Sequence, residues 1–173
     1  MATNGTVLVT GATGFVGSVL TRQLVAEGLD VRIFRRENSS LDLLGAKAEA
    51  VEHAVGDLTH ARSLYTAMDG IDRVYHVAAK VSFARRDREA LRRVNADGTA
   101  NVVNAALKAG VERLVHTSSI AALGRPTDDG LIDETMEWRD AAHRSDYARS
   151  KRRAELEVHR GLAEGLDAVI VNP

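Results

Sequence analysis

The sequence of 173 residues contains no cysteine, which excludes disulfide bonds and thiolate-ligated metal sites. Aromatic residues make up only 4% of it, and its two prolines form no linker that would divide the chain. No apolar run approaches the roughly 18 residues of a membrane span, and the N-terminus lacks the basic segment of a signal peptide. These absences predict one globular unit, residues 1–173, in the cytoplasm.

An excess of charge of either sign is also missing, because 23 basic residues face 24 acidic ones. The near balance gives no electrostatic reason to expect nucleic acid or a membrane surface as a partner. The basic stretch 85–93 is interpreted as a solvated helix face, since it has no interleaved aromatic residues for base stacking. The six histidines show no ligand-like spacing on one helix, so we predict no metal site.

What the sequence does have is a regular alternation of short apolar runs with longer helix-forming stretches. The predicted strands are residues 6–10, 31–34, 50–55, 73–77, 113–117 and 168–171. The predicted helices are residues 15–27, 61–68, 88–109 and 147–164. Continuous apolar strands are typical of a parallel sheet covered on both faces. The pattern therefore predicts an α/β fold with a Rossmann-like, doubly wound parallel sheet.

Three glycines, Gly11, Gly14 and Gly17, follow the first predicted strand and open the first predicted helix. Such glycines allow a tight turn, a close approach of the backbone to a pyrophosphate, and close packing of helix on strand. The helix N-terminus then offers oriented N–H groups to phosphates. The spacing GxxGxxG can also mark an ordinary turn, but its place between a strand and a helix favours dinucleotide binding.

The end of the second predicted strand suggests which dinucleotide. Folds that prefer NAD usually place a carboxylate there for the ribose 2′-hydroxyl, whereas this chain has Arg35 and Arg36. Two guanidinium groups can grip a 2′-phosphate, so NADP is favoured over NAD, although a solvated arginine pair is the alternative. Asp57, after the third strand, could accept the adenine amino group or simply cap a turn.

Tyr147 and Lys151 are spaced i, i+4 on a predicted helix, which makes their side chains neighbours. A nearby cation favours phenolate over phenol and thus fits a tyrosine to exchange a proton with a carbonyl oxygen. Alone, such a pair is usually a surface feature. Thr117, Ser118 and Ser119 lie at the end of the fifth strand, where the ligand crevice of such sheets forms, so a hydroxyl there can donate to the same oxygen.

In order along the chain stand TGATGFVG, GDL, HVAA, NxxGTxN, TSS and YxxxK. With these motifs the sequence resembles the extended short-chain dehydrogenases/reductases, also called the NAD-dependent epimerase/dehydratase family. The likeness spans essentially the whole chain and is greatest to the branch that resembles dihydroflavonol reductases and 3β-hydroxysteroid dehydrogenases. It implies that the pyrophosphate turn comprises Gly11, Thr13, Gly14, Phe15, Val16 and Gly17.

The resemblance implies further roles. Asp57 and Leu58 correspond to the adenine contact, and Asn95 to the helical asparagine of NxxGTxN. Segments along the adenine, ribose and nicotinamide correspond to Val77, Ala78, Ala79, Thr117, Asn172 and Pro173. Ser119 aligns with the catalytic hydroxyl, with Ser118 as a rival. Tyr147 aligns with the acid/base, and Lys151 with the residue that binds the nicotinamide ribose and tunes the tyrosine.

The expected reaction is hydride transfer between NADPH and the carbonyl of a small ketone. Dehydratases of the family carry Asp-Glu after the catalytic hydroxyl, whereas this chain has Ile120 and Ala121, which disfavours dehydration. A nucleotide-sugar epimerase with tightly held NAD is the alternative, and a non-catalytic dinucleotide sensor is a third. The resemblance also implies a homodimer, and a C-terminal substrate-binding region that lies beyond this chain.

Overall fold

The computed structural model describes residues 5–124, 130–136, 138 and 145–173. Its centre is a six-stranded sheet in the order β3-β2-β1-β4-β5-β6, with every neighbouring pair parallel. The strands are β1 (Val7–Thr10), β2 (Val31–Arg35), β3 (Glu52–Val55), β4 (Arg73–His76), β5 (Arg113–Thr117) and β6 (Ala168–Val171). The strand order reverses at β1, so the predicted Rossmann-like sheet is confirmed and its ligand crevice is expected at the carboxyl ends of β1 and β4.

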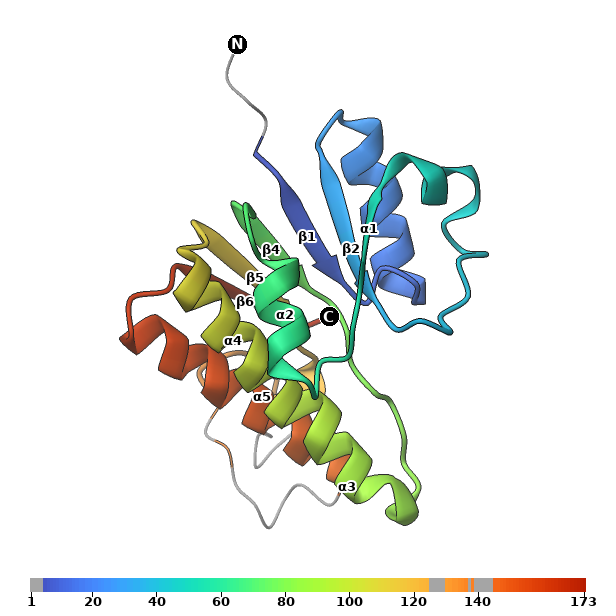
Figure 1. Ribbon diagram of the computed structural model, residues 1–173. Helices are drawn as coiled ribbons and strands as arrows, with labels where there is room; N and C mark the ends of the chain where they lie inside the picture. The colour runs from blue at the N-terminus through green and yellow to red at the C-terminus, as the bar shows by residue number, and fades with distance from the viewer. Residues whose placement is uncertain (1–4, 125–129, 137, 139–144) are drawn as a thin grey trace.

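Helices cover both faces of the sheet (Figure 1). On one face α1 (Phe15–Ala26) packs over β1 and β2. On the other lie α2 (Ala61–Ala67), α4 (Gly98–Ala109) and α5 (Asp146–Ala163). Shorter elements connect them: η1 (Gly45–Ala50), η2 (Arg85–Asp87), α3 (Arg88–Leu91), η3 (Arg92–Asp97) and η4 (Ile120–Ala122).

Side-chain alternation along the strands creates two apolar cores. Leu8 belongs with Val74 and Leu114 to the core under α2, α4 and α5. Its neighbours Val7 and Val9 point to the opposite face and pack beneath α1. Burial of both faces explains why these strands read as continuous apolar runs.

Two predicted elements differ from the structure by more than the shift of one residue at an end. The strand expected from residue 50 begins at Glu52, because residues 45–50 form a 3₁₀-helix. The helix expected over residues 88–109 is interrupted by the π-helical segment η3. A π-turn inserts one residue into a helix and changes the direction of the side chains that follow, and such turns are frequent at functional sites. Here the turn contains Asn95, whose buried side chain is bonded to another segment.

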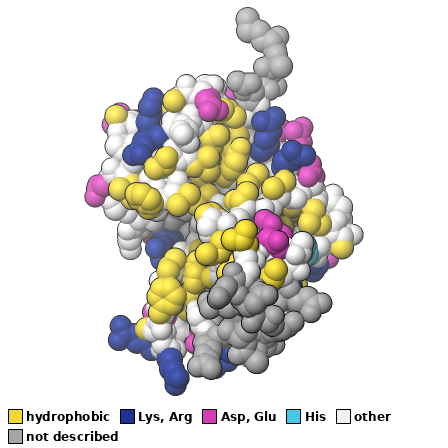
Figure 2. All heavy atoms as spheres, turned by 180° about the vertical axis from the view of Figure 1, so that it is seen from behind, with side chains coloured by type: hydrophobic (Ala, Val, Ile, Leu, Met, Phe, Trp, Pro, Cys, Tyr) yellow, Lys and Arg dark blue, Asp and Glu magenta, His cyan; other side chains and the backbone are white. Residues whose placement is uncertain are grey.

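The sheet face on which α1 lies is less completely covered than the opposite face, because α1 packs only over β1 and β2. Val169 and Val171 of the edge strand β6 are exposed, while Ala168 and Ile170, which alternate with them along the strand, pack against the core on the α5 side. Figure 2 shows apolar side chains gathered on the side opposite the view of Figure 1. The part of the chain that the structure describes contains no helix with the length and hydrophobicity of a membrane span.

Candidate functional site

The glycine turn joins β1 to α1 under tight steric limits. Gly11 has a positive φ of 75°, and a Cβ there would lie 2.6 Å from the backbone nitrogen of Ala78. A Cβ on Gly17 would overlap the carbonyl oxygen of Gly11. Helix α1 begins at Phe15 without a side-chain cap or an acidic residue in its first turn, so its N–H groups are available to an anion.

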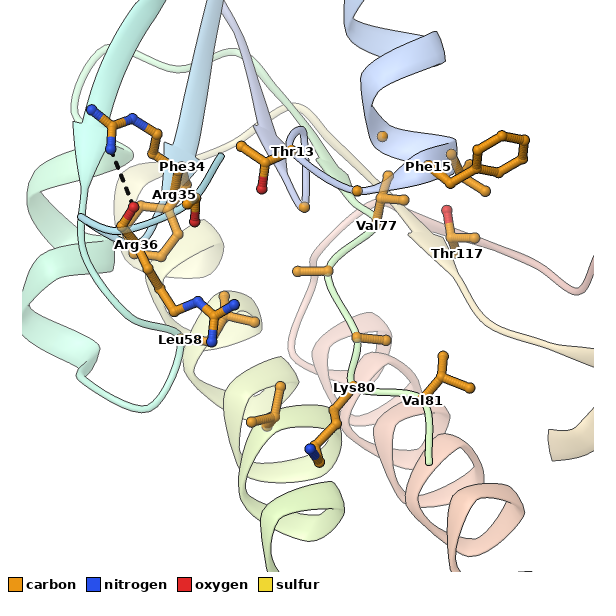
Figure 3. A pocket seen from close by; sticks show the side chains of 18 of the residues that line it. Thr13, Phe15, Phe34, Arg35, Arg36, Leu58, Val77, Lys80, Val81 and Thr117 are labelled. Carbon is orange, nitrogen blue, oxygen red and sulfur yellow. Dashed lines mark hydrogen bonds between the residues drawn. The ribbon is translucent and has the colours of Figure 1, made fainter. Parts of the chain in front are cut away.

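The turn forms one wall of a cleft of about 770 Å³ at the carboxyl ends of the strands (Figure 3). Every predicted site residue except Asn95 and Asn172 lines this cleft. The predicted lining residues are Gly11, Thr13, Gly14, Phe15, Val16, Gly17, Arg35, Arg36, Asp57, Leu58, Val77, Ala78, Ala79, Thr117, Ser119, Tyr147, Lys151 and Pro173. Residues that the sequence did not single out are Phe34, Ser39, Gly56, Lys80, Val81 and Val94. Several of these directly adjoin predicted ones, so extending each strand end by one or two residues would have found them.

The two arginines after β2 differ in their surroundings. Arg35 donates from Nε to His53 Nδ1 at 2.9 Å and from Nη1 to the carbonyl oxygens of Arg36 and Glu37 at 3.2 and 3.0 Å. The Arg36 guanidinium is exposed and extends toward the segment that carries Leu58 (Figure 3). The guanidinium of Arg36 is therefore the freer of the two to meet a ligand.

Asp57 caps the turn after β3. Its Oδ1 accepts from the backbone nitrogen and the hydroxyl of Thr59, at 2.8 and 2.7 Å. Partial burial raises the pKa of this carboxyl, but the Thr59 bonds and the charges of His60 and Arg36 bring it below its usual value. Asp57 is therefore ionised at neutral pH. The carboxylate caps the turn, which is one of the two roles expected from the sequence. Both of these bonds use Oδ1 and neither uses Oδ2.

Lys151 and Tyr147 reach the cleft from α5. The Lys151 side chain is 1% exposed, and its Nζ donates to the carbonyl oxygen of Thr117 at 2.9 Å. Burial lowers the pKa of Lys151 from 10.5 to about 8, against the opposing charge of Glu155. An ammonium has three hydrogens, so two remain for a ligand. The Tyr147 ring packs edge-on against Phe83, with centroids 5.9 Å apart.

The two serines after β5 are not equivalent. Ser119 Oγ accepts from the backbone nitrogen of Ala121 at 3.2 Å, which leaves the hydroxyl hydrogen free to be donated. Ser118 also lines the cleft, but its Oγ is shielded from solvent and has no partner within the described part of the chain. The exposure of the two side chains thus favours Ser119 as the hydroxyl that meets a ligand.

Asn95 lies behind the wall of the cleft rather than in it. Its Oδ1 accepts from the backbone nitrogen of Lys80 at 2.7 Å, and its Nδ2 donates to the Lys80 carbonyl oxygen at 2.9 Å. Nδ2 also donates to Ser150 Oγ at 2.8 Å, and that hydroxyl donates to the Tyr147 carbonyl oxygen at 2.7 Å. The side chain is fully occupied, so Asn95 fixes the segment after β4 relative to α5 instead of contacting a ligand.

A row of polar side chains lies beneath Lys151, on the face covered by α4 and α5. Thr10, His76 and His116 stand opposite one another on β1, β4 and β5. Thr99 Oγ1 donates to the Asn95 carbonyl oxygen, so His76 Nε2 must donate to Thr99 Oγ1 at 2.9 Å. His76 Nδ1 then accepts from Thr10 Oγ1 at 2.7 Å, which makes His76 a neutral imidazole.

Comparison with known proteins agrees with this geometry. Residues 7–173 match the NAD dependent epimerase/dehydratase family. The chain is 43% identical to the sterol demethylase protein B of Methylococcus capsulatus and 42% identical to a putative dihydroflavonol 4-reductase of Synechocystis, over 97% and 95% of its length. A short-chain dehydrogenase/reductase superfamily protein from Agrobacterium tumefaciens, solved with bound NAD, superposes with a TM-score of 0.78 at 30% identity.

The alignments cover nearly all of this chain but only about half of each of these proteins. The match takes in 50% and 47% of the two relatives and 48% of the solved chain, while covering 96% of this chain in the last case. The chain thus spans about half the length of the proteins that it resembles. By its sequence match and its Rossmann-like fold, the chain belongs to the NAD dependent epimerase/dehydratase family, the extended short-chain dehydrogenases/reductases.

Proposed function

We propose that this chain binds NADPH and serves an oxidoreductase that reduces the carbonyl group of a small molecule. The observation that carries the proposal is that Tyr147, Ser119 and Lys151 line the same cleft as the glycine turn. A proton donor, a hydroxyl donor and a cation thus share one cleft with a pyrophosphate-binding turn. The relative named as a dihydroflavonol 4-reductase supports reduction.

The cleft fits a dinucleotide on its own chemistry. The backbone of Gly11 and Gly17 leaves no room for a Cβ, and the uncapped N-terminus of α1 suits the pyrophosphate. The two unused hydrogens of Lys151 suit the hydroxyls of the nicotinamide ribose. NADPH, when bound, supplies the hydride.

The residues of the chain then handle the proton. Ser119 donates its hydroxyl hydrogen to the substrate oxygen and stabilises the charge that develops there. Tyr147 donates a proton to the same oxygen, and the Lys151 charge one helical turn away stabilises the resulting phenolate. Ile120 and Ala121, next to Ser119, cannot transfer protons, which argues against elimination of water.

The preference for NADPH rests on Arg36. Its exposed guanidinium stands after β2, where the 2′ position of the adenine ribose is expected, and can hold a phosphate with two parallel hydrogen bonds. Arg35 is bonded to His53 and to two carbonyl oxygens, so it supports the loop. Because these bonds occupy Arg35, Arg36 is the only one of the two arginines left for a 2′-phosphate. This point favours the alternative function, an epimerase that holds NAD.

Calorimetric titration with NADPH and NADH tests the cofactor. We expect NADPH to bind more tightly and Arg36→Ala to weaken NADPH binding by about 10-fold or more, the loss of one charge-assisted pair, while NADH binding stays unchanged. Arg85→Ala is the matched control, because this exposed arginine lies outside the cleft. Tighter binding of NADH in the unaltered protein would refute the preference.

Substitution of Tyr147 tests the reaction. Tyr147→Phe should slow hydride transfer from NADPH to a ketone by about 10²–10⁴-fold, the usual contribution of general acid catalysis, with little change in cofactor affinity. Tyr65→Phe on α2 is the control, since Tyr65 is outside the cleft. Unchanged turnover would remove Tyr147 from the mechanism. Tightly bound NAD together with interconversion of a nucleotide sugar would establish the epimerase instead.

A further inference from the structure

Glu155 is a buried carboxylate to which the proposed reaction gives no role. It lies on α5 one helical turn after Lys151 and is only 3% exposed. Its charged partner Arg152 is at 3.3 Å, and that side chain is 31% exposed. Burial of a charge costs several kcal/mol unless well-placed hydrogen bonds offset it, so the other bonds of this carboxylate matter.

The short bond of Glu155 goes to the end of β6. Asn172 Nδ2 donates to Glu155 Oε1 at 2.7 Å and to the carbonyl oxygen of Ser119 at 3.1 Å. Both partners are acceptors, so the Asn172 NH₂ group faces them and donates both of its hydrogens to them. The amide therefore bridges α5 and the loop that carries Ser119.

Other bonds show what this bridge holds in place. Lys151 Nζ donates to the carbonyl oxygen of Thr117. Helix α5 is therefore connected to the segment at the end of β5 at two points, directly through Lys151 and indirectly through Asn172. The loop that carries Ser119 is also attached to β6, because the Ser118 nitrogen donates to the Val171 carbonyl oxygen at 2.7 Å. Lys151 and Glu155 are thus two anchor points, one turn apart, between the helix of Tyr147 and the loop of Ser119.

We infer that Glu155 is a positioning residue that acts through Asn172 to fix the Ser119 hydroxyl relative to Tyr147 and Lys151. Without the carboxylate, the Asn172 amide loses one acceptor and the loop loses its second attachment to α5. The hydroxyl of Ser119 and the phenol of Tyr147 must meet one oxygen atom, and a displacement of about 1 Å can reduce a rate by about 100-fold. This inference rests on the proposed function for its kinetic consequence but not for its structural one.

Four variants test the inference. Glu155→Gln keeps an oxygen that can accept from Asn172, whereas Glu155→Leu and Asn172→Ala remove the bridge from either side. Glu157→Gln makes the same Glu-to-Gln change two residues along α5, at a side chain that is 34% exposed and paired with Arg160, and is the control. Asn172→Ala tests the bridge with the Glu155 carboxylate and its Arg152 partner left in place, should Glu155→Leu fail to fold.

The structural measurement uses the isotopically labelled protein. In Glu155→Leu the side-chain amide hydrogens of Asn172 should exchange with water about 10-fold faster or more, the loss expected for one hydrogen bond. In both variants without the bridge, the backbone amide of Ala121, which donates to Ser119 Oγ, should also shift. Glu155→Gln and Glu157→Gln should keep both signals. Unchanged signals in Glu155→Leu and Asn172→Ala would overturn the inference.

The kinetic measurement uses ketone reduction. Glu155→Leu and Asn172→Ala should each lower kcat by about 10- to 100-fold with KM for NADPH changed by less than about 3-fold, and the double variant should be no slower than either. Near wild-type kcat in Glu155→Gln separates positioning from loss of stability. A wild-type protein that reduces no ketone would refute the proposed function, while the exchange measurement would still decide the role of Glu155.

Discussion

At the scale of single residues, Lys151 shows the opposition between stability and function most directly. Its ammonium is buried and, among the residues that the structure describes, makes one hydrogen bond, to the Thr117 carbonyl oxygen. Burial brings its pKa to about 8, so the folded protein at neutral pH carries a charge that would be better solvated in the unfolded chain. The arrangement makes sense when a ligand completes the hydrogen bonds of the ammonium, since only then is the cost of desolvation offset.

We therefore expect Lys151→Met to stabilise the ligand-free protein. The change removes a buried charge, worth roughly 3 kcal/mol for a pKa depressed by about 2.5 units, and costs about 1 kcal/mol for the lost bond to Thr117. The net gain of about 1–2 kcal/mol is measured by urea unfolding at pH 7, with exposed Lys108→Met as the control. Cofactor affinity should fall at the same time.

The pH dependence gives this prediction its sign. Between pH 8 and 10.5 the unfolded chain holds the Lys151 proton and the folded one does not, so the wild-type protein gains stability as pH rises through this window. The advantage of Lys151→Met should therefore be largest below pH 8 and shrink above it. A constant difference between the two proteins would mean that the buried charge carries no such penalty.

At the scale of an element, the glycine turn allows a matched comparison of two alanine substitutions. A Cβ on Gly17 meets the Gly11 carbonyl, which is backbone and cannot move aside, whereas a Cβ on Gly14 lies 3.4 Å from that oxygen, an ordinary contact. Gly17→Ala should lower the free energy of unfolding by about 1–3 kcal/mol, the usual cost of overpacking, and Gly14→Ala by less than about 1 kcal/mol. Equal losses in urea unfolding would show that β1 and α1 can separate at this point.

Elements also show where prediction from sequence succeeds. The apolar run Val7-Leu8-Val9 and the glycines after β1 follow from local rules, because burial on two faces and a tight turn each impose a residue type. The π-segment at Arg92–Asp97 could not be predicted, because it accompanies a tertiary bond from Asn95 to Lys80. Glu155 reads as an ordinary helix residue until Asn172, 17 positions away, is placed beside it.

At the scale of the whole molecule, acid stability depends on the polar row across the sheet. His76 and His116 are almost completely buried between the sheet and the helices, with ring centroids 5.0 Å apart. Burial, aided by the charge of Lys151, lowers the pKa of His76 to about 3. Burial likewise lowers the pKa of His116, with smaller contributions from His76 and Lys151. Both rings are neutral in the folded protein.

The consequence is a loss of stability in acid that belongs to the fold as a unit. Below about pH 6.5 the His76 side chain takes up a proton in the unfolded chain but stays neutral in the folded one. The free energy of unfolding therefore falls as pH drops toward 3. His76 alone should remove about 3 kcal/mol between pH 7 and pH 4. Asp57 adds to the same trend, because its lowered pKa is a contribution that is lost when the carboxyl is protonated.

His116→Phe isolates this effect. Both ring nitrogens of His116 lack a hydrogen-bond partner within the described part of the chain, so a phenyl ring of similar shape removes the titration without breaking such a bond. We expect a stability close to or above that of the wild type at pH 7 and a flatter decline between pH 6.5 and 4, measured by urea unfolding across that range. His159→Phe on the exposed side of α5 should leave the slope unchanged. Parallel pH profiles for His116→Phe and the wild type would show instead that the ring at position 116 is charged or solvated in the folded protein, and that the row beneath Lys151 admits water.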